Sequence, residues 1–151
     1  MTDLQAIADR VEIEALRAEF TDAAMMNDYG RLASLFTPDG VMRWPHVGVD
    51  FADRETISTA GSRRDEMVDL FVQTTHQGAI TLEGDTASGR AYIQELIHLR
   101  DGSSHQNFAI YHDQYQRTPE GWKFAERVYE VRYVDSTPLG GSAPRAAQQA
   151  R

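Results

Sequence analysis

Apolar residues recur every three to five positions through the first part of the chain. This spacing predicts an amphipathic helix from Leu4 to about Met26. Thr2, with Gln5 three residues later, has the form of a helix-capping box at its start. The apolar series consists of Leu4, Ile7, Val11, Leu16, Phe20 and Ala23 or Ala24. A second, short helix is predicted over Tyr29–Phe36.

The pattern is less regular between the second helix and the middle of the chain. Pro38-Asp39-Gly40 is a strong turn signal, and it is followed by a short strand predicted over Val41–Pro45. Asp53–Leu70 then predicts one or two helices, with an interruption near Gly61-Ser62.

In the second half of the chain, apolar residues recur at every second position, which predicts strands. The strand candidates are Gln73–Leu82, Thr86–Arg100, Ser104–Thr118 and Trp122–Val134. The breaks between them contain Gly84, Gly102 and Gly121 and suit hairpin turns. Long strands joined by tight turns make an antiparallel meander, and helices segregated at the N-terminus make the class α+β. We expect a single domain over residues 1–137, in which the curved sheet encloses one apolar pocket, and a flexible tail over residues 138–151.

Charge and composition exclude several classes of function. Lys and Arg number 15 against 23 Asp and Glu, a net charge of −8, so the surface should repel nucleic acid and anionic membranes. Cysteine is absent, which removes disulfides, thiolate nucleophiles and Cys-ligated metals. The early charges argue against a signal peptide, and no apolar run approaches the ~20 residues of a membrane span. We therefore expect a cytoplasmic protein.

Three predicted strands each carry one ionisable residue in a mainly apolar row. Because side chains alternate across a strand, each strand divides into two faces. The rows are Thr74, His76, Gly78, Ile80 and Leu82; Ala91, Ile93, Glu95, Ile97 and Leu99; and Ala125, Arg127, Tyr129, Val131 and Tyr133. If the rows face one interior, His76, Glu95 and Arg127 converge. Burial displaces the pKa of an unpaired charge, and an imidazole in such a setting suits general acid–base catalysis.

Structural roles would explain the same residues. His76 could be a satisfied core histidine, and Glu95 could form an ion pair with Arg127. The opposite face of the last strand is also apolar, so the orientation of Arg127 stays open. Trp44, Tyr111 and Tyr129 could be packing residues, although a pocket tyrosine can donate to a developing oxyanion.

Metal and phosphate chemistry have weaker support. His46, His98, His105 and His112 do not form a metal-ligand spacing, so no metal site is expected. The sequence also has no phosphate-binding Gly-rich loop, nucleophile elbow or zinc helix.

Several local strings occur in an order that resembles the SnoaL-like group of the nuclear transport factor 2-like superfamily. They are residues 7–10 (IADR), 29–36 (YGRLASLF), 38–40 (PDG), 86–92 (TASGRAY), 111–115 (YHDQY) and 121–124 (GWKF). The resemblance covers roughly residues 5–137 and implies a cone-shaped, curved antiparallel sheet packed against N-terminal helices. The most similar branch contains scytalone dehydratase, hexachlorocyclohexane dehydrochlorinase and bile-acid 7α-dehydratase. Those enzymes perform eliminations with a pocket histidine that an aspartate of the first helix orients.

The resemblance assigns positions to the same three ionisable residues. His76 falls at the histidine position, Arg127 at a pocket arginine of the dehydrochlorinase, and Glu95 at a position that is acidic in the bile-acid enzyme.

The first helix departs from the family pattern. Met25 stands at the position of the orienting aspartate, and Phe20 at a tyrosine position of the bile-acid enzyme. Because a methionine cannot fix the tautomer of an imidazole, another carboxylate must replace the aspartate or the mechanism is lost. Asp22, one turn before Met25, and Glu95 are the candidates, and we favour Glu95 as the partner of His76.

Together these observations predict a cofactor-independent lyase or isomerase: a dehydratase, a double-bond isomerase or a cyclase. The substrate would be a hydrophobic, cyclic, oxygenated small molecule. His76 would move a proton, and Glu95 would orient it or act as its acid–base partner. Arg127, with Tyr111 or Tyr129, would bind substrate oxygen. The predicted substrate-binding residues are Phe20, Asp22, Met25, Trp44, Tyr111 and Tyr129.

Two other functions are compatible with the same fold. Met25 could mark a binding or accessory protein that has lost catalysis, and a structural subunit of a larger oligomeric enzyme is the third reading. The outer sheet face carries more apolar residues than a solvated face needs, which predicts a homodimer or homotrimer. These outer residues are Tyr92, Leu96, Phe108 and Ile110.

Overall fold

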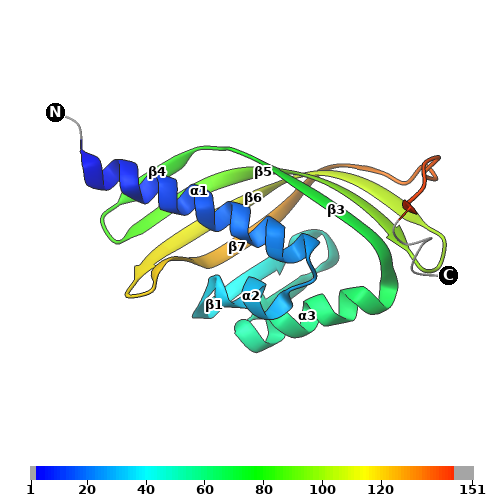
Figure 1. The fold of residues 1–151 in the computed structure, drawn as a ribbon, viewed down its shortest axis with the longest axis horizontal. Helices are drawn as coiled ribbons and strands as arrows, with labels where there is room; N and C mark the ends of the chain where they lie inside the picture. The colour runs from blue at the N-terminus through cyan, green and yellow to red at the C-terminus, as the bar shows by residue number, and fades with distance from the viewer. Residues whose placement is uncertain (1–2, 145–151) are drawn as a thin grey trace.

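The first helix lies across the sheet and covers its concave face (Figure 1). The computed structural model describes residues 3–144, and in it α1 spans Leu4–Met25, as the apolar spacing predicted. Its N-cap is Asp3, whose carboxylate accepts the backbone N–H groups of Gln5 and Ala6 at 3.0 and 3.2 Å. Asp3 therefore takes the capping role predicted for Thr2, which lies outside the described residues.

A predicted turn proves to be a bulge inside a strand. α2 spans Tyr29–Ser34, and β1 then runs continuously over Phe36–Trp44, through Pro38-Asp39-Gly40. The pairing of β1 with the last strand shifts register between Phe36 and Val41, so the turn residues bend the strand instead of preceding it. A 3₁₀ turn, η1 (Pro45–Val47), follows. The strand β2 (Val49–Ala52), which pairs antiparallel with β1, was not predicted.

α3 is one continuous helix, Arg54–Met67, so the predicted interruption at Gly61-Ser62 is wrong. Gly61 permits close packing: a Cβ there would lie 2.1 Å from Cδ1 of Tyr29. β3 begins directly at Val68, where the sequence pattern still predicted helix.

Replacing Gly61 by alanine is expected to destabilise the protein by about 1–3 kcal/mol, because the added methyl group overpacks the α2–α3 contact. Gly30→Ala is the matched control, since nothing lies within 4 Å of a Cβ at that helical position. The control should be neutral or stabilise by up to about 1 kcal/mol. Urea unfolding of both variants measures the difference, and equal stabilities would contradict the role given to Gly61.

The second half forms the long strands of the sheet. They are β3 (Val68–His76), β4 (Ile80–Glu83), β5 (Thr86–Leu99), β6 (Ser104–Thr118) and β7 (Gly121–Asp135). The predicted strand Gln73–Leu82 is thus two strands, separated at residues 77–79. The strand order is β2-β1-β7-β6-β5-β3, with β4 paired to β5.

The α+β class is confirmed, with three helices and one curved, unclosed seven-stranded sheet in the described residues 3–144 (Figure 1). One detail of the predicted sheet is wrong: β1 pairs parallel with β7, so the sheet is mixed. No helix of residues 3–144 combines the length and the apolar character that crossing a bilayer requires.

The outer face of the sheet is partly apolar, as expected. Tyr92 and Phe108 are exposed there, whereas Ile110 is buried with 8% of its surface accessible. Residues 139–143 of the predicted tail line a shallow groove together with Leu70 and Leu96 of this face, and residues 145–151 lie outside the described part. Assembly into a homodimer or homotrimer through this face stays a prediction.

Candidate functional site

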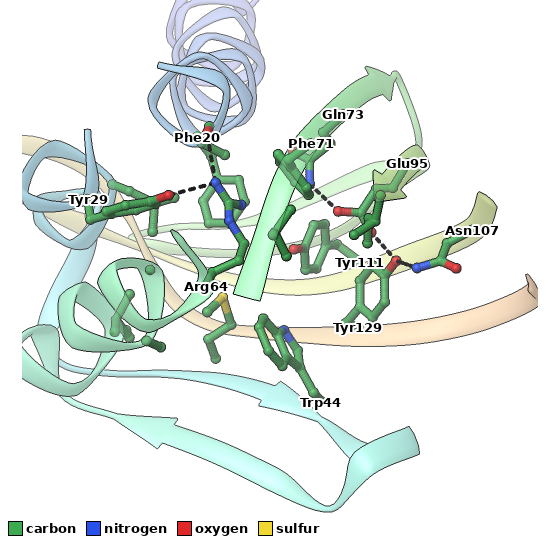
Figure 2. A pocket seen from close by; sticks show the side chains of 18 of the residues that line it. Phe20, Tyr29, Trp44, Arg64, Phe71, Gln73, Glu95, Asn107, Tyr111 and Tyr129 are labelled. Atoms are coloured by element: carbon green, nitrogen blue, oxygen red, sulfur yellow. Dashed lines mark hydrogen bonds between the residues drawn. The ribbon is translucent and has the colours of Figure 1, made fainter. Parts of the chain in front are cut away.

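A cavity of about 240 Å³ lies between the concave face of the sheet and the three helices (Figure 2). Its wall is mainly apolar and aromatic, as expected for a site that binds a small organic molecule. The apolar and aromatic lining residues include Phe20, Leu32, Met42, Trp44, Ile57, Phe71, Ile97, Tyr111 and Tyr129. Four of the predicted substrate-binding residues, Phe20, Trp44, Tyr111 and Tyr129, are therefore in the wall.

Glu95 is the acidic residue of this wall. Only 7% of its surface is accessible, and its carboxylate accepts two hydrogen bonds. The hydroxyl of Tyr129 donates to Oε1, and Nε2 of Gln73 donates to Oε2 at 3.1 Å (Figure 2). Burial raises the pKa of Glu95 above its ordinary value, although the two donors and the charge of Arg64 partly oppose this. Glu95 is thus a carboxyl group that is easily protonated, as an acid–base catalyst must be.

Strand register explains why these polar groups meet. Gln73 pairs with Glu95 across β3 and β5, and Glu95 pairs with Asn107 across β5 and β6. The side chains extend the row into a chain of hydrogen bonds: Thr21 donates to Oε1 of Gln73 at 2.8 Å, and Asn107 donates to the Tyr129 hydroxyl at 3.5 Å. Each member therefore fixes the orientation of the next.

Two tyrosines at the site keep their protons. Burial and the neighbouring Glu95 raise the pKa of Tyr111 and of Tyr129 well above the ordinary tyrosine value. The hydroxyl of Tyr129 is occupied by Glu95, whereas that of Tyr111 has no hydrogen-bond partner among residues 3–144. Tyr111 can therefore donate a hydrogen bond to an oxygen atom of a bound molecule.

The predicted convergence of His76 with Glu95 is wrong. His76 is exposed at the end of β3 and is not in the cavity wall. His76 does not share a face with Ile80 and Leu82, because the break at residues 77–79 interrupts the alternation between β3 and β4. The inward row of β3 contains Phe71 and Gln73 instead.

The residues predicted from the first helix also lie elsewhere. The backbone N–H of Gln73 donates to Sδ of Met25 at 3.1 Å, so the strand residue that contacts position 25 is Gln73 and not His76. Met25 itself is half-buried and outside the cavity wall. Asp22 is exposed and forms an ion pair with Arg31, because it faces away from the sheet. The histidine–aspartate pair that the resemblance implied is absent at these positions.

Arg127 faces the interior but lies behind the cavity. It is 1% accessible and pairs with Asp113, with Nε–Oδ1 and Nη2–Oδ2 distances of 2.7 and 3.1 Å. Its guanidinium carbon lies 3.8 Å from the ring centroid of Tyr111 and 4.4 Å from that of Phe20. Arg127 therefore supports the cavity floor, and it is not in the wall from which the predicted contact with substrate oxygen would be made.

Sequence reasoning missed five polar residues of the wall. They are His46, Arg64, Gln73, His105 and Asn107. Gln73 and Asn107 could have been found from their register with Glu95, but Arg64 lies on α3, where the apolar spacing is weak. Partial burial lowers the pKa of His46, which favours its neutral form. Residues 3–144 contain no group of three or more His, Asp or Glu side chains placed to hold a metal ion.

The raised pKa of Glu95 predicts a pH-dependent cost to folding. A raised folded-state pKa gives stability that is fully present below the unfolded value, near 4.5, and is lost as pH rises through the folded value. Because glutamine has no proton to lose, Glu95→Gln should gain stability relative to the wild type as the pH rises above about 5. Urea unfolding at several pH values measures this, with the exposed Glu83→Gln as control. A stability difference that stays constant with pH would contradict the raised pKa.

Comparisons with known proteins agree with this architecture. An uncharacterized protein of Mycobacterium tuberculosis, Rv2910c, is 25% identical over 130 residues, which cover 85% of this chain and 88% of the relative. The crystal structure of hexachlorocyclohexane dehydrochlorinase LinA-type3 from Novosphingobium barchaimii LL02 superposes with a TM-score of 0.82 at 23% identity. That match covers 93% of this chain and 97% of the dehydrochlorinase, and it shows a shared fold. The model of the SnoaL-like domain family matches residues 5–128, most of the chain, and the protein belongs to this family.

Proposed function

We propose that the protein is a lyase or isomerase that moves a proton on a hydrophobic, cyclic, oxygenated small molecule, with Glu95 as the general base. One observation carries the proposal: the Glu95 carboxyl group is buried in an apolar cavity between two fixed hydrogen-bond donors. A desolvated carboxylate is a stronger base than one in water, because water no longer stabilises its charge. The proposal needs no cofactor, since proton transfer between a carboxylate and carbon uses none.

The proposed step begins with the carboxylate form of Glu95. It takes a proton from a substrate carbon next to a carbonyl group, and the C–H electron pair forms a carbon–carbon double bond as the carbonyl oxygen becomes negative. The hydroxyl of Tyr111, which stays protonated, would donate a hydrogen bond to this oxygen. Return of the proton to another carbon gives isomerisation, and loss of a group from the adjacent carbon gives elimination.

The fold neighbours are compatible with this chemistry but do not identify it. The name of the dehydrochlorinase describes an elimination, and its structure matches 93% of this chain. In the present chain Met25 stands at the position of the implied aspartate, and His76 lies outside the cavity wall, so the proposed base is Glu95. Methionine in place of that aspartate also favours the alternative, a small-molecule-binding protein of this fold without catalysis.

A generic elimination reaction distinguishes the proposed enzyme from a non-catalytic binding protein, and it does not require the natural substrate to be known. 5-Nitrobenzisoxazole opens when a base removes the proton on carbon 3: the C–H electron pair forms the nitrile, the N–O bond breaks, and the ring oxygen becomes the phenolate of the single, coloured product. We expect the wild-type protein to accelerate this reaction with saturation kinetics, beyond the rate with acetate at equal concentration. Binding of the probe without acceleration would favour the non-catalytic alternative and overturn the proposal.

A further inference from the structure

Arg64 lies in the wall of the mainly apolar cavity, and no carboxylate among residues 3–144 forms an ion pair with it. The other two arginines at the core differ in this respect. Arg17 pairs with Glu14 at 3.1 Å, and Arg127 pairs with Asp113 at 2.7 Å. Arg64 is half-buried, and it reaches a carboxylate only through the hydroxyl of Tyr29, which donates to Oδ1 of Asp65 at 2.5 Å, so a ligand carboxylate can pair with the guanidinium directly.

The side chain of Arg64 is held in place at one end only. Nη2 donates to the backbone oxygen of Ala24 at 3.1 Å and to the hydroxyl of Tyr29 at 2.8 Å. The guanidinium carbon lies 3.8 Å from the ring centroid of Phe71, and Figure 2 shows Arg64 between Tyr29 and Phe71. Nε is buried without a partner and out of reach of a ligand, whereas Nη1 donates to none of the described residues and is the donor left for one. The charge is therefore positioned in advance, with donor capacity left for a ligand.

The charge balance of the cavity favours an anionic ligand. The acidic residue of the wall, Glu95, already receives hydrogen bonds from Tyr129 and Gln73, and burial shifts it toward its neutral, protonated form. His46 is also shifted toward its neutral form. An arginine side chain, by contrast, carries five N–H donors and no acceptor, so Arg64 is the group of this wall that is suited to a carboxylate.

We propose that the cavity selects molecules in which an apolar ring system carries a carboxylate, and that Arg64 binds this carboxylate. The ring would lie against the aromatic wall, and the carboxylate would supply the counter-ion that the protein does not. This names a substrate class for the proposed function and rests on that function for the reaction, but ligand binding can be measured separately.

The test compares two ligands of nearly the same shape, 2-naphthoate and the neutral 2-naphthamide, by isothermal titration calorimetry at pH 7.5. A charge-assisted hydrogen bond contributes enough free energy that wild-type protein should bind the carboxylate about tenfold or more tightly. Arg64→Met should reduce this preference to within about twofold while the amide still binds. Arg63→Met is the matched control: it removes the same charge from the adjacent, exposed position of α3 and should keep the preference.

A further variant guards against loss of structure, since Nη2 of Arg64 also anchors α1 and Tyr29. Arg64→Lys keeps the positive charge and should keep part of the preference for naphthoate. Thermal unfolding followed by circular dichroism establishes that each variant is folded. The inference is wrong if wild-type protein does not prefer the carboxylate, including the case in which neither ligand binds, or if a folded Arg64→Met variant retains the preference.

The outcome also separates this inference from the proposed function. Glu95→Gln should slow proton transfer by about 10²–10⁴-fold but keep the preference for 2-naphthoate, because the carboxylate contact is made by Arg64. Proton transfer without any carboxylate preference would overturn the substrate class alone. A carboxylate preference without proton transfer would overturn the proposed function alone.

Discussion

Replacement of Glu95 by glutamine is expected to lower the rate of 5-nitrobenzisoxazole opening by about 10²–10⁴-fold, the usual contribution of a general base. Glutamine keeps the shape of the side chain and can still accept a hydrogen bond from Tyr129, but its amide cannot take a proton from carbon. Probe binding should therefore change little while turnover falls. Initial rates at saturating probe, measured by the absorbance of the phenolate product, give the comparison.

Glu83→Gln is the control for this substitution. Glu83 ends β4, is exposed and lies outside the cavity wall, so its replacement makes the same change in charge at a distance from the site. The control should retain the wild-type rate. If Glu95→Gln and Glu83→Gln were equally active, the base would have to be another group, and the role given to Glu95 would be wrong.

The largest effect on stability is expected from Asp113→Asn, which should cost about 3–5 kcal/mol. Asp113 is 1% accessible, accepts both hydrogen bonds from Arg127, and also accepts the hydroxyl of Tyr115 at 2.7 Å. The Tyr115 hydroxyl in turn accepts Nε of the buried Arg17 at 2.7 Å. Removing this carboxylate therefore leaves the buried guanidinium of Arg127 without its counter-ion. It also removes the acceptor that orients the Tyr115 hydroxyl toward Arg17.

An exposed ion pair provides the comparison for Asp113. Asp50 pairs with Arg43 at 2.6 Å, but more than half of the Asp50 side chain is accessible, so Asp50→Asn should cost at most about 1 kcal/mol. The double variant Asp113→Leu/Arg127→Met should be less destabilised than the sum of its single changes, because it leaves no unpaired charge. Urea unfolding measures all of these values. A cost for Asp113→Asn as small as that for Asp50→Asn would show that the buried pair does not stabilise the fold.

Elements with one strong period were predictable from the sequence. The spacing from Leu4 onward defined α1, and alternation bounded by glycine turns defined β5, β6 and β7. Gly84, Gly102 and Gly121 all have positive φ, which explains why the turns were visible. Two shorter features were not predictable. β2 has only four residues, too few to show an alternation, and the bulge of β1 contains residues that are typical of turns.

The candidate site was predictable only in part, because alternation gives the face of a residue but not its neighbours. Counting back from the hairpin at Thr118 and Gly121 would place Arg127 opposite His112. The register shift between Gln114 and Tyr115 moves its partner to Asp113, and the sequence carries no clear sign of this shift. Glu95 was identified because a glutamate in an apolar row is unusual, and that reasoning needed no register.

The most direct test of the account is the pH dependence of kcat/KM for 5-nitrobenzisoxazole with wild-type protein, corrected for the reaction with hydroxide. Since the carboxylate is the active form, the rate should rise with pH through a single ionisation and then level off. Burial should place the midpoint above the ordinary glutamate value of about 4.5, and the rise should be absent in Glu95→Gln. A profile that is flat above about pH 5, or the same rise in the variant, would contradict the central claim that the buried Glu95 carboxylate is the base.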